Sequence, residues 1–188
     1  MQEKLRGDLT ESMAAIEATI ATCLPDVTAA AEAVVECYRA GGKVLIAGNG
    51  GSAADAQHFA GEMLGWFLDR ERRPLPAIAL TTDTSVLTSI ANDASVEAIF
   101  ARQVEGHGQA GDAFIGISTS GASANILEAM KTAKALGMTT IALCGKPGSP
   151  IAESVDIAIS VPAELTPHIQ IAHASVLHGI CRMVDEES

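Results

Sequence analysis

A regular alternation of short apolar runs with helical stretches constrains the fold of this chain more than any other feature. The apolar runs are continuous and do not alternate with polar residues, which is typical of strands covered by helices on both faces. The repeated strand–helix order therefore predicts an α/β fold with a doubly wound, five-stranded parallel sheet flanked by helices, similar to flavodoxin-like sheets. The expected strands are 43–47, 77–80, 113–117, 139–143 and 157–161, and the expected helices are 53–67, 84–106, 122–136 and 165–186.

Residues 8–39 have a helical pattern that one proline interrupts, at Leu24-Pro25-Asp26. Proline both ends a helix and favours the first turn of the next one, so this break predicts two antiparallel N-terminal helices. A length of 188 residues leaves little room for a second core. We therefore expect a single domain over 1–188, with the helical pair in 1–40 and the sheet in 41–188.

Composition excludes several classes of partner. Twelve basic residues against twenty-three acidic ones give a net charge of −11, and no cluster of Lys and Arg forms a footprint for a nucleic-acid backbone. We expect no membrane partner either, because no run reaches the roughly 18 uninterrupted apolar residues of a spanning helix. The four cysteines form no C-x-x-C pair, which favours buried, reduced thiols and a cytoplasmic protein.

Two loops after predicted strands have the composition of ligand-binding loops. The first, Gly48-Asn49-Gly50-Gly51-Ser52, allows close approach to a ligand and leads into a helix. Its G-x-G-x-x-A pattern also raises a dinucleotide site, but no acidic residue follows at the required distance of about 20 residues. The second loop, Ser118-Thr119-Ser120-Gly121-Ala122-Ser123, has four hydroxyls where one would cap the helix. It predicts a phosphate cradle, with a polar turn carrying redundant caps as the alternative.

Two pairs of polar residues lie at helical spacing. His58 and Glu62 are four residues apart, and Gln170 and His178 project about 80° apart around one helix axis. These four side chains make a plausible zinc set if their helices meet, although Gln is an uncommon ligand. Ordinary surface polarity with hydrogen-bonded histidines is the alternative, and the spacing does not decide. His168 is isolated and is expected at the surface.

With these stretches in view, the chain resembles the sugar isomerase (SIS) domain family, and within it the phosphoheptose isomerases. The resemblance covers essentially the whole chain and depends on the combination of motifs, since the hydroxyl loop alone would indicate only some SIS domain. The matching stretches are 42–45, 48–52, 55–60, Glu62, 76–80, Asn92-Asp93, 116–121, Ile169-Gln170 and His178.

The resemblance implies an aldose–ketose isomerase that converts D-sedoheptulose 7-phosphate to D-glycero-D-manno-heptose 7-phosphate by enediol proton transfer, the first step of ADP- or GDP-heptose biosynthesis. It implies one Zn²⁺ per subunit, and a homotetramer built around the N-terminal helices with active sites at subunit boundaries. By this resemblance Glu62 and His178 are the catalytic pair, and His58, Glu62, Gln170 and His178 hold the metal. The substrate-binding residues would be Asn49, Gly50, Gly51, Ser52, Glu62, Asn92, Asp93, Ser118, Thr119, Ser120, Ser123 and Gln170.

The sequence departs from the family pattern at two places, where Trp66 follows Gly65 and where Pro167-His168 precedes the glutamine. Both changes remove polar groups that could contact the sugar, so the exact substrate is less defined than the reaction. The alternative function is that of a non-catalytic, initiator-associating SIS protein that acts through protein contacts. Glu62 and His178 argue against that branch, and the length argues against a sugar-phosphate sensor fused to a DNA-binding domain.

Overall fold

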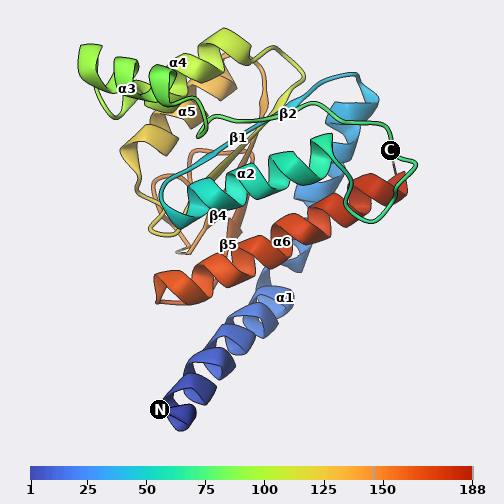
Figure 1. Cartoon of the computed structure of the whole chain (residues 1–188), viewed down its shortest axis with the longest axis vertical. Helices are drawn as coiled ribbons and strands as arrows, with labels where there is room; N and C mark the ends of the chain where they lie inside the picture. The colour runs from blue at the N-terminus through green and yellow to red at the C-terminus, as the bar shows by residue number, and fades with distance from the viewer. Residues whose placement is uncertain (146, 188) are drawn as a thin grey trace.

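A five-stranded parallel sheet forms the centre of the protein, with strand order β2-β1-β3-β4-β5 (Figure 1). The structure is a computed structural model that describes residues 1–145 and 147–187. The predicted fold class is confirmed, and every predicted strand is present within one residue of its expected ends. The strands are β1 (Val44–Gly48), β2 (Ala77–Ala79), β3 (Ala113–Ser118), β4 (Thr139–Cys144) and β5 (Ile157–Ser160).

The continuous apolar runs contribute side chains to two hydrophobic cores, one on each face of the sheet. Successive side chains of a strand point to opposite faces. Val44 and Ile46 of β1 therefore join the cluster beneath α1, α2 and α6, whereas Leu45 and Ala47 join the cluster beneath α4 and α5. The helices are α1 (Gln2–Arg39), α2 (Gly51–Leu64), α3 (Thr84–Asp93), α4 (Ala98–His107), α5 (Ala124–Ala135) and α6 (Thr166–Glu187).

The N-terminal region is one continuous helix, so the prediction of two antiparallel helices is wrong. Helix α1 runs through Pro25 for 38 residues. Pro25 and its neighbours Leu24 and Asp26 are exposed, so water can bond the carbonyl that the proline leaves without an N–H donor. Cys23 and Ala30 are buried on the inner face, and this packing holds the helix together on both sides of the proline.

Helix α1 is also long and apolar enough to cross a membrane by length and composition alone. One third of its most apolar window is buried inside the protein, against α6 and the sheet. A helix that packs on a core in this way fits a soluble protein. The first turns project beyond the body of the molecule (Figure 1), and they expose Leu5, Leu9 and Met13.

The single helix expected over 84–106 is two helices, α3 and α4, which is a second correction. The chain leaves helical geometry at Ala94, after Asn92 and Asp93. Asparagine, aspartate and serine bond neighbouring backbone groups in non-helical conformations, which makes such a stretch a favourable place for a helix to end. Asp83 caps the start of α3 by accepting a hydrogen bond from the Val86 N–H.

Candidate active site

The strand order places a crevice at the carboxyl ends of β1 and β3. The chain leaves β1 toward β2 on one side, whereas β3 lies on the other side of β1, so the direction of winding reverses between β1 and β3. Ligands of open α/β sheets bind at such switch points. The two predicted loops meet here, because the amides of Asn49 and Asn125 donate to each other at 3.0 and 2.9 Å. Asn125 was not predicted, since a single amide on a helix has no motif.

The glycine loop brings backbone close to the last helix. Gly50 has φ of 58°, a left-handed conformation that favours glycine, and α2 begins at the next residue. A Cβ on Gly51 would lie 2.5 Å from Nε2 of Gln170. The amide of Gln170 is therefore packed directly on the first turn of α2, which follows Asn49 and includes Ser52. This contact brings α6 to the glycine loop.

The hydroxyl loop brings three serine hydroxyls together in one cluster. Ser118 Oγ lies 2.9 Å from Ser123 Oγ and 3.4 Å from Ser120 Oγ. Within the described chain, Ser123 makes no capping bond to the N–H groups of the first turn of α5. Thr119 and Ser120 line a groove of about 660 Å³. Hydroxyls and N–H groups at a helix N-terminus suit a phosphate. Ser120 Oγ also accepts the Ala122 N–H at 3.3 Å, as in the polar-turn alternative, so the phosphate cradle stays a prediction.

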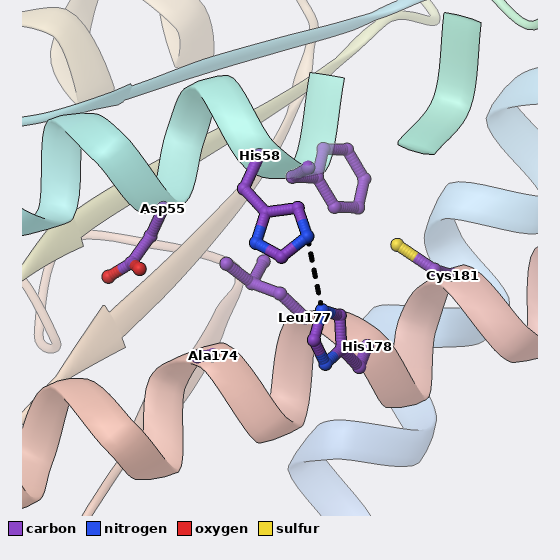
Figure 2. A pocket seen from close by; sticks show the side chains of 7 residues that line it. Asp55, His58, Ala174, Leu177, His178 and Cys181 are labelled. Carbon is purple, nitrogen blue, oxygen red and sulfur yellow. Dashed lines mark hydrogen bonds between the residues drawn. The ribbon is translucent and has the colours of Figure 1, made fainter. Parts of the chain in front are cut away.

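Helices α2 and α6 bring the predicted acid–base residues together. His58 Nε2 lies 2.9 Å from Glu62 Oε1 and 3.4 Å from His178 Nε2, and the two imidazole rings meet edge to face (Figure 2). The 3.4 Å contact joins residues 120 positions apart in the chain. The two helices therefore meet, as the zinc set requires, and the contact between the two histidines also agrees with the alternative of exposed, hydrogen-bonded histidines.

The donor set fits a zinc ion in chemical type. Two imidazole nitrogens on one tetrahedral zinc lie about 3.3 Å apart, close to the observed separation of the His58 and His178 Nε2 atoms. No three His, Cys, Asp or Glu side chains among the described residues already surround a common metal position. Gln170 contacts Gly51, on the side of α6 toward its N-terminus. Its place in a ligand set is therefore a proposal.

Three further residues of this region were not predicted as site residues, although Asp55 lies in the matching stretch 55–60. Asp55 lines the small cavity beside His58 and His178 (Figure 2), and its Oδ2 is buried with no hydrogen-bond partner among the described residues. Burial raises the pKa of the Asp55 carboxyl, and the nearby His58 opposes that shift. The Phe67 ring stacks on the His178 ring with centroids 5.5 Å apart. Arg72 binds the last turn of α2, as described below.

The remaining candidates lie further from this cluster. Asn92 and Asp93 form the end of α3, where the Asn92 amide donates to Asp93 at 2.8 Å and both side chains are exposed. Helix termination accounts for them in this structure, and a role toward a sugar stays a prediction. His168 is buried and not at the surface, because the unbroken α1 covers it; Ser12 Oγ lies 2.9 Å from its Nδ1.

Comparison with known proteins identifies the family of the chain. The family model described as "SIS domain" matches residues 9–145. The chain belongs to the SIS domain family. A phosphoheptose isomerase of Roseiflexus sp. (strain RS-1) is 52% identical over 167 residues, which cover 89% of this chain and 84% of that protein. A phosphoheptose isomerase of Geobacter sp. (strain M21) is 47% identical over 100% of this chain and 97% of its own.

Solved structures of the same family superpose on nearly the whole chain. Phosphoheptose isomerase GmhA from Neisseria gonorrhoeae has a TM-score of 0.92 at 42% identity, with 98% of each chain covered. A phosphoheptose isomerase from Francisella tularensis has a TM-score of 0.94 at 38% identity, also covering 98% of each chain. This SIS protein is therefore an enzyme, an isomerase.

Proposed function

We propose that this SIS isomerase converts D-sedoheptulose 7-phosphate to D-glycero-D-manno-heptose 7-phosphate. The observation that carries the proposal is the convergence of Glu62, His58 and His178 across α2 and α6. The names of its relatives support a phosphorylated heptose as the substrate. The reaction would begin ADP- or GDP-heptose biosynthesis, with lipopolysaccharide as one destination of the product.

The phosphate group would bind at the hydroxyl loop. Neutral donors suit this task, because a protein with a net charge of −11 offers no general attraction for an anion. The N–H groups at the start of α5 add the positive end of a helix dipole. The hydroxyls that would hold the phosphate are those of Ser118, Thr119, Ser120 and Ser123.

The sugar chain would then extend toward α2 and α6. Asn49 to Ser52 and Gln170 lie between the hydroxyl loop and the histidine cluster, since Asn49 bonds Asn125 of α5 and Gln170 packs on Gly51. These groups would orient the hydroxyls of the sugar chain. Asn92 and Asp93 would add contacts from α3 at the same edge of the sheet.

The isomerisation moves one proton between C1 and C2 through an enediol. A base must remove the carbon-bound proton, and a second group must move the hydroxyl proton. Glu62 and His178 would share these transfers, with His58 Nε2 within hydrogen-bond distance of the carboxylate. The order in which the two residues act is not assigned.

Zinc would be held, one ion per subunit, by His58, Glu62, Gln170 and His178. When bound, it would supply positive charge that polarises the substrate oxygen as negative charge develops there. The two histidines and the carboxylate are ordinary zinc donors. The residues of the chain do the binding, the orientation and the proton transfer.

The functional assembly would be a cytoplasmic homotetramer. Leu5, Leu9, Met13 and Ile20 form an exposed apolar stripe on α1, at 59%, 65%, 62% and 58% exposure. Such a stripe on one helix is a typical contact surface between subunits. All four cysteines are free and buried, as expected of a reducing compartment.

The deciding experiment is turnover of the proposed substrate. The purified protein would be incubated with sedoheptulose 7-phosphate, with and without added zinc, and the products followed by NMR. Formation of the heptose 7-phosphate would establish the reaction. A folded protein that gives no product even with zinc would reject it, and the non-catalytic alternative would then be tested by protein pull-down.

A further inference from the structure

A buried arginine ties together the two helices that carry the proposed acid–base pair. Arg72 lies in the segment between α2 and β2, yet its side chain is only 3% exposed. Its guanidinium donates to the carbonyl of Glu62 at 2.7 Å and to the carbonyl of Met63 at 2.9 Å. It therefore bonds the backbone of α2 at the residue whose side chain faces His58, and at the residue after it.

The other side of this guanidinium is held by α6. Arg72 Nε donates to Asp185 Oδ1 at 2.6 Å, and the Asp185 side chain is 4% exposed. Asp185 Oδ2 accepts the backbone N–H groups of Leu68 and Asp69 at 2.7 and 2.9 Å. Burial alone would raise the pKa of the Asp185 carboxyl, but these N–H groups and Arg72 together hold that pKa below its usual value. One carboxylate thus fixes the segment after α2 onto α6.

The same segment contacts His178 directly. Phe67 precedes the two N–H groups that Asp185 binds, and its ring stacks on the His178 imidazole at an interplanar angle of 29°. Asp185 lies seven residues after His178, about two helical turns along the same side of α6. The segment 65–72 is therefore attached to α6 at two places, and to α2 through Arg72.

We propose that Arg72, Asp185 and Phe67 act as a positioning device that sets the separation and orientation of Glu62 and His178. The inference rests on the proposed function, which makes those two residues the acid–base pair. Its physical basis is that a buried ion pair recovers little net stability after desolvation, so its main effect here is on geometry. Proton transfer is sensitive to such geometry, because misplacement by about 1 Å can lower a rate about a hundredfold.

A matched control exists at the amino end of β3, in a network that binds neither α2 nor α6. Asp112 precedes β3, and its carboxylate accepts Lys43 Nζ at 2.6 Å, Lys43 N at 3.0 Å and Gln109 N at 2.9 Å. It has the same kind of partners as Asp185, namely one cation and two backbone N–H groups, but none of these partners belongs to α2, α6 or the segment 65–72. D112N therefore reports the cost of weakening such a network without touching the site.

The experiment compares D185N and R72K with D112N, each corrected for its folded fraction. All three variants should lower the melting temperature. Only D185N and R72K should lower kcat, by roughly ten- to a hundredfold, with KM within about twofold because the hydroxyl loop is unchanged. Equal kcat per folded molecule in D185N and D112N would overturn the inference.

A second readout does not depend on turnover. The ring ¹H and ¹³C signals of His178, measured on the metal-free protein, should shift in D185N and in F67L, but not in D112N or F67Y, because Tyr keeps the stacked ring. A shift in D185N with no heptose turnover in the wild type would leave the positioning role standing and reject the proposed function. Unchanged His178 signals in D185N would reject the positioning role.

Discussion

The Gln170 amide lies against the backbone of Gly51, at a distance that leaves no room for a side chain. An added Cβ would lie 2.5 Å from Nε2 and 2.9 Å from Oε1 of Gln170. The contact joins the start of α2 to α6, and it places one proposed substrate and zinc residue beside the glycine loop. Glycine at this position allows the Gln170 amide to approach this closely, and any side chain there would displace the amide.

Gly51→Ala should therefore displace Gln170. We expect turnover to fall by at least about tenfold, while stability changes by no more than about 1 kcal/mol, because alanine itself favours a helix. Steady-state kinetics and urea unfolding would measure the two effects. Gly61→Ala is the control, since no atom lies within 4 Å of a Cβ there; an equal loss of turnover in both variants would contradict the prediction.

Glu62→Gln should abolish catalysis and leave the fold intact. The amide can still meet His58, which now lies 2.9 Å from Oε1, but it cannot accept a proton from carbon. We expect kcat to fall by about 10²- to 10⁴-fold, with circular dichroism and melting temperature close to the wild type. The control is Glu105→Gln, because Glu105 is an exposed residue of α4. Retained turnover in Glu62→Gln would remove this residue from the acid–base pair.

Ser123→Ala should weaken the hold on phosphate. Ser123 Oγ lies 2.9 Å from Ser118 Oγ, and loss of one hydrogen bond to a charged group costs about 1.5–3 kcal/mol. We expect KM for the sugar phosphate to rise about 10- to 100-fold, with less effect on kcat. Ser175→Ala, an exposed residue of α6, should change neither constant. A loss confined to kcat would argue against a phosphate contact.

The strands were predictable because each continuous apolar run is buried on both faces, as in β1, where every residue is buried. Two predictions were wrong for one physical reason: that the N-terminal helix breaks at Pro25, and that His168 lies at the surface. The cost of one proline is local, whereas the packing that holds α1 together comes from residues distant in sequence. Because α1 continues past Pro25, its first half reaches α6 and buries His168 beside Ser12.

The candidate site likewise combines residues that the local sequence predicts with residues that only the fold reveals. His58, Glu62, Gln170, His178 and the hydroxyl loop follow from local spacing and composition, and the family resemblance assigned their roles. The roles of Asp55, Phe67 and Arg72 could not be predicted, because they depend on which segments meet across α2 and α6. An arginine in a polar stretch such as Arg70-Glu71-Arg72-Arg73 has no local signal that marks it as buried.

The exposed apolar stripe of α1 should be the contact surface of the proposed tetramer. Leu9→Glu and Met13→Glu together would place two charges where Leu9 and Met13 are 65% and 62% exposed in the single chain. We expect the assembly to dissociate, as measured by light scattering after size-exclusion chromatography. Ala14→Glu adds a charge at an exposed position at least 100° around the same helix from Leu9 and Met13, and should leave the assembly unchanged. A double variant that stays tetrameric would place the interface elsewhere.

Acid should destabilise the protein partly through His173. This residue is fully buried, and its Nε2 lies 3.1 Å from the carbonyl of Cys144. Burial lowers the pKa of His173 from 6.5 to about 4, although the hydrogen bond to Cys144 opposes the shift. The unfolded chain therefore binds a proton between pH 6.5 and 4 that the folded protein does not bind. Stability is complete above pH 6.5 and falls as the pH drops toward 4.

The size of this effect follows from the pKa difference, and amounts to about 3 kcal/mol between pH 6.5 and 4. Urea unfolding at a series of pH values would measure it in the wild type and in His173→Gln, whose amide can still donate to the Cys144 carbonyl. The variant should lose less stability over this interval, whereas His107→Gln, at the exposed end of α4, should follow the wild type. Asp185, whose pKa is lowered, stabilises the folded protein above about pH 4, and this contribution is lost only at lower pH. Parallel curves for wild type and His173→Gln would show that His173 is not the group responsible.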